Sequence, residues 1–249
     1  MTQLTRSTIN RSIDRAMRVL DGFGVNLPPF AFWSPEKWEA AGGECAEIRE
    51  CMLGWDVTDF GSGEFEQIGR TLFTLRNGIV GHPRFDKPYA EKLILDPEGQ
   101  RAPAHYHKQK REDLINRFGG NLLCEMYGVA EDGRSRADHA LEVQVDGQTR
   151  RISAGELIRL EPGQSLCIPP RTVHQFWGEV GTGFVIDGVG YTVSGEVSSV
   201  CDDRGDNYFL DDMVRFPEIV EDEPRRYVLC HEYPQTAAAT TGSEAGHGE

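Results

Sequence analysis

The apolar positions of the first fifty residues follow the spacing of amphipathic helices. From Thr5 to Leu20 they recur on one helical face, with arginines on the other: Ile9, Ile13, Ala16, Met17 and Leu20. Ser34 followed by Pro35 is typical of an N-cap and a first helical position, and residues 44–53 fit a short third helix. Three short helices bury little by themselves. We therefore expect residues 1–55 to form a helical extension packed on the outside of the remaining chain.

After residue 70 the pattern changes to short strands interrupted by glycine and proline at roughly eight-residue intervals. Strands are predicted at 70–76, 91–95, 121–127, 139–145, 151–153, 156–160, 165–168 and 173–177. Asp146-Gly147 indicates a hairpin turn, whereas residues 55–61, with Asp and Gly at turn positions, are predicted to be a loop. This rhythm favours a mainly β sandwich or barrel over residues 56–234, and residues 235–249, almost without large apolar side chains, are expected to be a disordered tail.

Composition and charge narrow the function classes. The formal net charge is −14, and without a basic stripe the chain is not expected to bind nucleic acid or anionic membranes. No apolar run approaches the roughly 20 residues of a membrane span, and the N-terminus lacks a signal-peptide core. Six cysteines form no C-x-x-C pair, so reduced thiols in a cytoplasmic protein are expected.

The most informative stretch is GQRAPAHYHKQKREDLINRFGG, residues 99–120. His105 and His107 lie two apart in a predicted strand, so both imidazoles face the same side and can share a metal ion. Glu112 follows where an antiparallel neighbour would return a carboxylate to that place. The Gly119-Gly120 pair would supply the positive φ values of a tight turn. By itself a His-x-His pair is more often two exposed strand histidines.

The spacing Gly99-x5-His105-x-His107-x4-Glu112-x6-Gly119 resembles the first motif of the cupins at every position. Gly163-x5-Pro169-x4-His174 resembles their second motif, although Arg171 stands where the family often has glycine and Gly178 where asparagine is frequent. The resemblance implies a single cupin barrel, a double-stranded β-helix or jelly roll, with His174 as a fourth metal ligand.

Three imidazoles and one carboxylate suit a first-row divalent ion, and spacing does not separate Mn²⁺, Fe²⁺, Co²⁺, Ni²⁺ and Zn²⁺. An ion that prefers six ligands would keep two positions for neighbouring oxygens, which an α-hydroxy carbonyl compound offers. Residues 108–111 connect His107 to Glu112 and are called the ligand link here. Lys110, inside this link, and Glu196, on a late strand, are the candidate catalytic groups. Lys92, Asp206 and Arg215 are assigned to substrate binding. The plainer alternative places these lysines on a solvated face and pairs Glu196 with an arginine.

Over about residues 28–234 the chain resembles the D-lyxose isomerase family of cupin sugar isomerases. The resemblance is carried by LGWDVTDFGSGEF, LFTLRNG, EKLILDPEGQRAPAHYHKQKREDLINRFGGNL and RFPEIVEDE. It implies an aldose–ketose isomerase that interconverts D-lyxose with D-xylulose, and D-mannose with D-fructose, with a divalent ion, commonly Mn²⁺. A base would move the C2 proton to C1 through a metal-stabilised cis-enediol, and a hydride shift is the competing mechanism. A homodimer is expected, since cupins of this size often pair through sheet edges.

Three other functions stay open at this point. A phosphosugar isomerase or epimerase would need cations facing the pocket, for which Arg101, Arg111, Arg171 and Arg215 are the candidates. An Fe²⁺ dioxygenase would use the same four ligands. A non-catalytic cupin would bind sugar without turnover.

Overall fold

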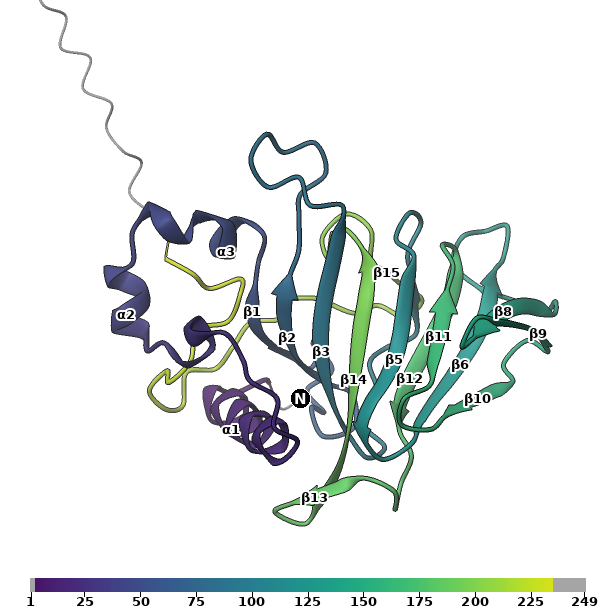
Figure 1. Cartoon of the computed structure of the whole chain (residues 1–249), viewed down its shortest axis with the longest axis horizontal. Helices are drawn as coiled ribbons and strands as arrows, with labels where there is room; N and C mark the ends of the chain where they lie inside the picture. The colour runs from purple at the N-terminus through teal and green to yellow at the C-terminus, as the bar shows by residue number, and fades with distance from the viewer. Residues whose placement is uncertain (1–2, 235–249) are drawn as a thin grey trace, which may run out of the picture.

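The computed structural model describes residues 3–234, which form two curled antiparallel sheets with helices at one end (Figure 1). The helices are α1 (Arg6–Gly22), α2 (Pro35–Ala40) and α3 (Ala46–Glu50), with 3-10 turns at Pro29–Phe32 and Gly43–Cys45. No helix within the described part of the chain is long and apolar enough to span a membrane.

The larger sheet has the strand order β1-β2-β3-β14-β5-β11-β8-β9, and β13 pairs with β14. Its strands are β1 (Gly54–Thr58), β2 (Arg70–Arg76), β3 (Tyr89–Pro97), β5 (Glu112–Gly119), β8 (Leu141–Val145), β9 (Gln148–Ile152), β11 (Ser165–Ile168), β13 (Phe184–Ile186) and β14 (Val189–Ser199). The smaller sheet has the order β10-β6-β12-β4-β15, and β7 pairs with β6. Its strands are β4 (His105–Tyr106), β6 (Leu122–Val129), β7 (Arg136–Ala137), β10 (Leu157–Leu160), β12 (Thr172–Gly178) and β15 (Tyr208–Phe209).

The two sheets enclose one apolar core and the helices cover a second. The inner core joins residues of both sheets, such as Leu114 of β5 and Phe176 of β12. The outer core lies between α1 and the strands β1, β2, β3 and β14. On β3, Leu93 and Leu95 belong to the outer core, while Ile94 belongs to the inner one. Strands of the larger sheet are therefore buried on both faces. The two curled antiparallel sheets and the helices before them confirm the mainly β fold with an N-terminal helical extension.

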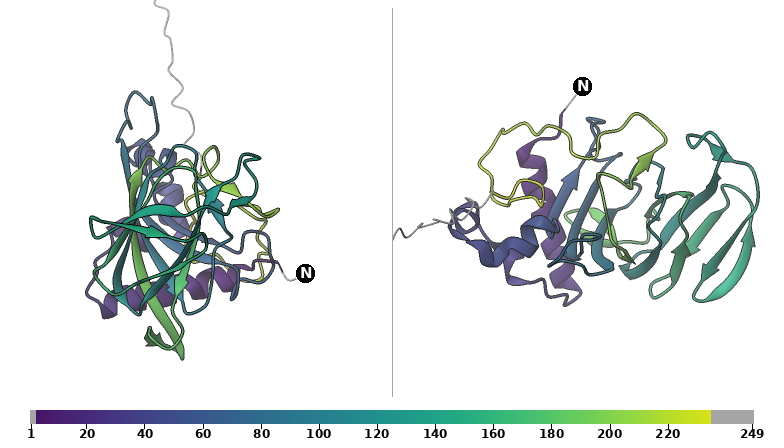
Figure 2. Two further views of the ribbon diagram at one scale, coloured as in Figure 1. Left: turned by 90° about the vertical axis from the view of Figure 1, so that its right-hand side faces the viewer. Right: turned by 90° about the horizontal axis from the view of Figure 1, so that it is seen from above.

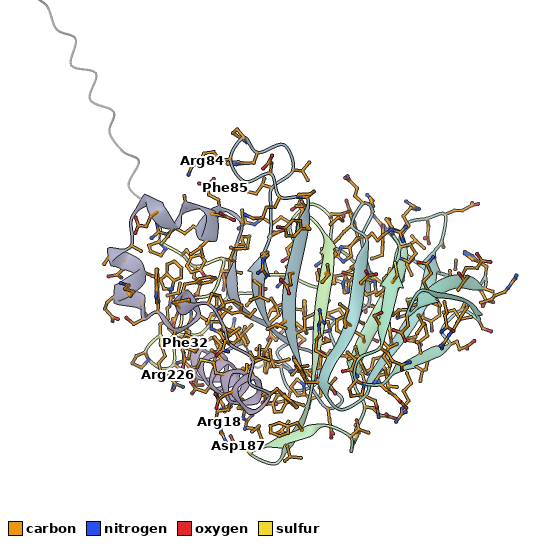
Figure 3. All side chains as sticks on the ribbon, in the orientation of Figure 1. Arg18, Phe32, Arg84, Phe85, Asp187 and Arg226 are labelled. Atoms are coloured by element: carbon orange, nitrogen blue, oxygen red, sulfur yellow. The ribbon has the colours of Figure 1, made fainter. Side chains whose placement is uncertain are left out.

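The helical extension is held at the β1 end of the larger sheet, opposite β8 and β9 (Figure 1). Thr5 caps α1 and Ser34 caps α2, each by accepting an amide hydrogen bond three residues on. Arg18 of α1 pairs at 2.6 Å with Asp187, in the turn between β13 and β14 (Figure 3). The C-terminal segment, residues 220–234, passes beside α1, where the N–H of Arg6 donates to the carbonyl of Val220 (Figure 2). The predicted disordered tail, 235–249, lies outside the described residues.

Two local predictions were wrong. Residues 55–61 were predicted to be a loop, but Gly54–Thr58 is strand β1, fully buried and paired with β2. The aspartate was interpreted as a turn residue, but Asp56 is buried and contacts Arg215. Of the two glycines at the end of β5, only Gly119 has a positive φ, 86°. The hairpin turn at Asp146-Gly147 is confirmed, with φ of 52° and 75°.

Candidate metal centre and active site

The predicted metal ligands meet in a pocket between the two sheets. His105 of β4 and His174 of β12 are direct register partners, and His107 follows β4. One ligating atom from each of the three histidines lies within 4.8 Å of the others. His107 and His174 are buried, and His105 is partly buried.

Every Nδ1 atom of this histidine triad is bonded to a backbone carbonyl. The pairs are His105 with Pro103 at 2.9 Å, His107 with Asp206 at 2.5 Å, and His174 with Thr172 at 3.0 Å. Because a carbonyl oxygen only accepts, each ring carries its proton on Nδ1 and its lone pair on Nε2 when neutral. Burial lowers the pKa of His105, and it lowers the pKa of His107 to about 4, with Lys110 adding to the effect.

The inward-facing atoms of this group lack protein partners. Nε2 of His107, Nε2 of His174 and Oε1 of Glu112 are buried without a hydrogen bond. Nε2 of His174 lies 2.8 Å from Oε1 of Glu112, so the imidazole and the carboxylate point at the same place. The Nδ1 atoms of these imidazoles are held by backbone carbonyls, and their Nε2 atoms converge. This arrangement fits a divalent cation.

Glu112 reaches the triad by a different route from the one expected. It begins β5, where its register partners are Ile168 of β11 and Ser198 of β14. It therefore lies in the larger sheet, whereas His105 and His174 lie in the smaller one. The carboxylate comes from the facing sheet rather than from an antiparallel neighbour of the histidine strand.

Lys110 and Glu196 lie next to the candidate metal ligands. Nζ of Lys110 is 2.5 Å from Oε2 of Glu112 and 2.8 Å from Oε1 of Glu196. Burial alone would lower the pKa of Lys110, but the two carboxylates hold it well above its ordinary value. Burial would raise the pKa of both glutamates, and Lys110 holds it low in each. The lysine is thus an ammonium and Glu196 a carboxylate at neutral pH.

Lys92 faces the same pocket from β3. It is the cross-strand partner of Glu196, whose Oε1 is 3.8 Å from its Nζ. Nζ of Lys92 also lies 2.8 Å from Sγ of Cys201 and 3.9 Å from Oδ1 of Asp203. Burial would lower the pKa of Lys92, but Asp203, Cys201 and Glu196 raise it. The solvated-face alternative for these lysines does not hold in the structure, because Lys92 and Lys110 are each 4% exposed.

Arg215 lies in the pocket wall with its charge already balanced. Its Nη2 contacts Asp56 and lies 3.1 Å from Oδ2 of Asp203, while its buried Nη1 has no hydrogen-bond partner. The free Nη1 is a donor available to a pocket ligand. The structure thus places Arg215 where a substrate-binding residue was predicted.

Asp206 does not line the pocket, in contrast to its predicted contact with substrate. Its two carboxylate oxygens accept backbone N–H groups from residues 108–110. The next residue, Asn207, does line the pocket, and its Oδ1 is buried without a partner. Sequence reasoning selected Asp206, whereas the side chain that lines the pocket is that of its neighbour Asn207.

Two further charged residues that line the pocket, Arg70 and Asp203, were missed. Arg70 of β2 pairs with Asp96 of β3, and its guanidinium lies 4.2 Å from the ring centre of Phe176. Asp203 and Asp56 share Arg215. No spacing rule predicts these pairs, since they depend on strand register and on long-range folding.

A second group, Asp56, Cys230 and His231, also brings three potential ligand atoms within 4.8 Å. The Asp56 carboxylate is contacted by the Arg215 guanidinium, whose positive charge opposes a cation there. Burial also raises the pKa of the Cys230 thiol well above its ordinary value, so it is a protonated thiol. The histidine triad is therefore the better metal centre.

The chain resembles known proteins over most of its length. A family model described as D-lyxose isomerase matches residues 4–233. The chain is 43% identical over 228 residues to a D-lyxose/D-mannose isomerase of Serratia proteamaculans, covering 91% of this chain and 96% of that protein. It is 43% identical over 233 residues to one of Escherichia coli O157:H7, covering 93% and 99%.

A solved structure of an Acinetobacter sp. DL28 L-ribose isomerase variant in complex with L-ribose has the same fold. The TM-score is 0.58 at 13% identity, covering 88% of this chain and 98% of that one. At this identity the likeness concerns the fold alone.

Proposed function

The chain belongs to the D-lyxose isomerase family, and from that membership we propose that it interconverts D-lyxose with D-xylulose and D-mannose with D-fructose. It is an aldose–ketose isomerase that depends on a divalent ion, with Mn²⁺ as the proposed native metal. The supporting observation is the set of inward-facing Nε2 atoms beside the buried carboxylate of Glu112.

His105, His107, His174 and Glu112 would hold the ion. When bound there, a divalent ion supplies Lewis-acid polarisation of the sugar carbonyl and its neighbouring hydroxyl. The carbonyl partners of the three Nδ1 atoms keep the ligand rings oriented.

Glu196 is the proposed general base. Lys110 and Lys92 keep it ionised against the effect of burial, so it can accept the C2 proton of an open-chain aldose and return it to C1. The species between the two transfers is a cis-enediol, and the isomerisation is completed when the hydroxyl proton of O2 has passed to O1. The Lys110 ammonium, 2.8 Å from this carboxylate, stabilises negative charge that develops on the substrate oxygens. Lys92, Asn207 and Nη1 of Arg215 are the proposed contacts to the sugar hydroxyls.

The charges of the pocket favour a neutral sugar over a phosphorylated one. The four cationic side chains that line it each contact a carboxylate: Arg70 with Asp96, Lys92 with Asp203, Lys110 with Glu112, and Arg215 with Asp56. Arg101, Arg111 and Arg171, the other arginines considered for phosphate binding, are exposed and do not line the pocket. A carboxylate already offsets the positive charge of each of these four side chains, so a phosphate would gain only the free Nη1 donor of Arg215.

Metal removal tests the proposal directly. Chelated protein should not form D-xylulose from D-lyxose, and adding back Mn²⁺, Co²⁺, Ni²⁺, Fe²⁺ or Zn²⁺ singly should identify the active ions. Full turnover by metal-free protein would contradict the proposal. Saturable sugar binding without turnover under every ion would instead identify a non-catalytic cupin, and oxygen uptake with Fe²⁺ and an added aromatic or thiol substrate would identify a dioxygenase.

A matched pair of histidine variants separates the metal site from general damage. His107→Ala should lose both bound metal and activity, whereas His139→Ala, which alters an exposed histidine, should keep both. The expected homodimer and the cytoplasmic location stay predictions, to be checked by light scattering and by cell fractionation.

A further inference from the structure

We propose that Asp206 is a positioning residue that fixes the metal ligand His107 and the catalytic candidate Lys110 relative to each other. The inference rests on the proposed function, because it concerns the ligand link of that site. Asp206 itself does not line the pocket, so it would act only through the residues it holds.

The Asp206 carboxylate binds three consecutive backbone amides. Its Oδ1 accepts from the N–H of Lys108 at 2.8 Å and of Gln109 at 3.2 Å. Its Oδ2 accepts from Gln109 at 3.1 Å and from Lys110 at 2.8 Å. Consecutive N–H groups that converge on one anion form a concave nest. The backbone between His107 and Lys110 is thus fixed by one side chain.

The same residue also holds the ring of His107. The backbone carbonyl of Asp206 accepts a 2.5 Å hydrogen bond from Nδ1 of His107, which sets the tautomer and the direction of Nε2. Side chain and main chain of one residue therefore contact both ends of the link. Without these hydrogen bonds, the positions of the His107 imidazole and the Lys110 ammonium relative to each other would no longer be fixed.

Asp206 is suited to this role because it is itself fixed. It is 8% exposed, and its N–H donates to the carbonyl of Asp202 at 2.9 Å. The Asp202 side chain in turn accepts from the N–H groups of Arg204 and Gly205. Hydrogen bonds within residues 202–206 therefore hold this turn independently of its contacts with the ligand link.

Hydrogen exchange of the metal-free protein tests the clamp without any turnover. In Asp206→Ala, amides 108–110 should exchange at least about tenfold faster than in the wild type, because they lose their acceptor. Titration with Mn²⁺ should show a dissociation constant raised by up to about tenfold, because the backbone after His107 loses its anchor while the Asp206 carbonyl that accepts from Nδ1 of His107 stays in place. Asp206→Glu, which keeps the charge, should recover part of both effects.

Asp146→Asn is the matched control. The Asp146 carboxylate also accepts several hydrogen bonds in a turn, including 2.7 Å from the N–H of Ser165, but it lies in the β8–β9 hairpin. It should leave amides 108–110 and Mn²⁺ affinity unchanged. If Asp206→Ala does not fold, Asp206→Asn, which retains one acceptor oxygen, provides the same comparison.

Wild-type exchange at 108–110 together with wild-type Mn²⁺ affinity in a folded Asp206 variant would overturn the inference. Equal effects in the Asp146 control would overturn it as well, because they would report general loosening. A wild-type protein that binds no divalent ion would instead overturn the proposed function, and the exchange result would still decide whether Asp206 holds the link.

Discussion

Nζ of Lys110 lies 2.8 Å from Oε1 of Glu196, and both side chains are buried inside the barrel. Lys110 lies between the proposed metal ligands His107 and Glu112, and Glu196 lies in the middle of β14. A buried pair of this kind loses much of the hydration of both charges, and its mutual attraction must offset that loss. Its position beside Glu112 therefore suggests a role in chemistry rather than in stability.

Lys110→Met should keep the bound metal and lower the rate by about 100-fold or more, because a positioned acid–base group typically raises the rate by at least that factor. Since Lys110 helps to hold the pKa of Glu196 low, the acidic limb of the pH–rate profile should also move to higher pH. Metal content by mass spectrometry and D-xylulose formation measure the two effects. Lys108→Met is the control, because Lys108 is exposed and its Nζ lies over the ring of Tyr208. Unchanged activity in Lys110→Met would remove this lysine from the mechanism.

Glu196→Gln should lower kcat by roughly 100- to 10,000-fold with metal content unchanged, because the amide has the same shape but accepts no proton. The wild-type reaction in D₂O should place deuterium at C1 of D-xylulose, as read by NMR. Complete absence of deuterium would point to a hydride shift. Glu91→Gln on the neighbouring strand, where Glu91 pairs with Arg76, should behave as wild type.

Phosphorylated sugars should be poor substrates. With each pocket cation already bound to a carboxylate, D-lyxose 5-phosphate should show a kcat/KM at least about 100-fold below that of D-lyxose, since a phosphate pays desolvation without gaining a free cation. Steady-state rates on both sugars make the comparison. A preference for the phosphorylated sugar would favour the phosphosugar isomerase instead.

The sequence predicted that the four proposed ligands would lie together, because that information is local. His105, His107 and Glu112 lie within one short segment, and a second motif supplies His174. The ion pairs of Arg70 and Arg215 were not predictable in this way, since each joins residues brought together by sheet register.

The role of Asp206 was misassigned because composition does not reveal which way a carboxylate points in a turn. Strand β1 was missed for a related reason. Asp56 is a turn signal when exposed and a core residue when an arginine from a distant segment neutralises it.

Arg171→Gly should stabilise the protein slightly. Arg171 has a φ of 59°, which costs a residue with a side chain about 1–2 kcal/mol, and the greater freedom of glycine in the unfolded chain offsets about half of that. Urea unfolding should show a gain of roughly 0.5 kcal/mol with activity retained. Arg151→Gly, in the extended strand β9, should destabilise by about 0.5–1 kcal/mol. A loss of stability in Arg171→Gly would mean that its side chain makes a compensating contact.

The ion pair between Arg6 and Glu221 should make stability depend on pH in a predictable direction. Arg6 is fully buried and its Nη2 lies 2.7 Å from Oε1 of Glu221, which ties the start of α1 to the C-terminal segment. The hydrogen bond from Arg6 lowers the pKa of Glu221 to about 2, from 4.5 for the unperturbed group. A carboxyl whose pKa is depressed by folding stabilises the native state above its unfolded pKa, and this stabilisation is lost as pH falls from about 4.5 to 2.

Glu221→Gln should therefore lower the free energy of unfolding at pH 7 by about 1 kcal/mol, a value kept modest because half of the Glu221 side chain is exposed and water screens the pair. The difference from wild type should shrink steadily below pH 4.5, as measured by urea unfolding at several pH values. Glu218→Gln removes an equal charge from an exposed position nearby and should show little effect at any pH. A deficit in Glu221→Gln that stays constant down to pH 2 would mean that packing, and not the charge of the carboxylate, joins this segment to α1.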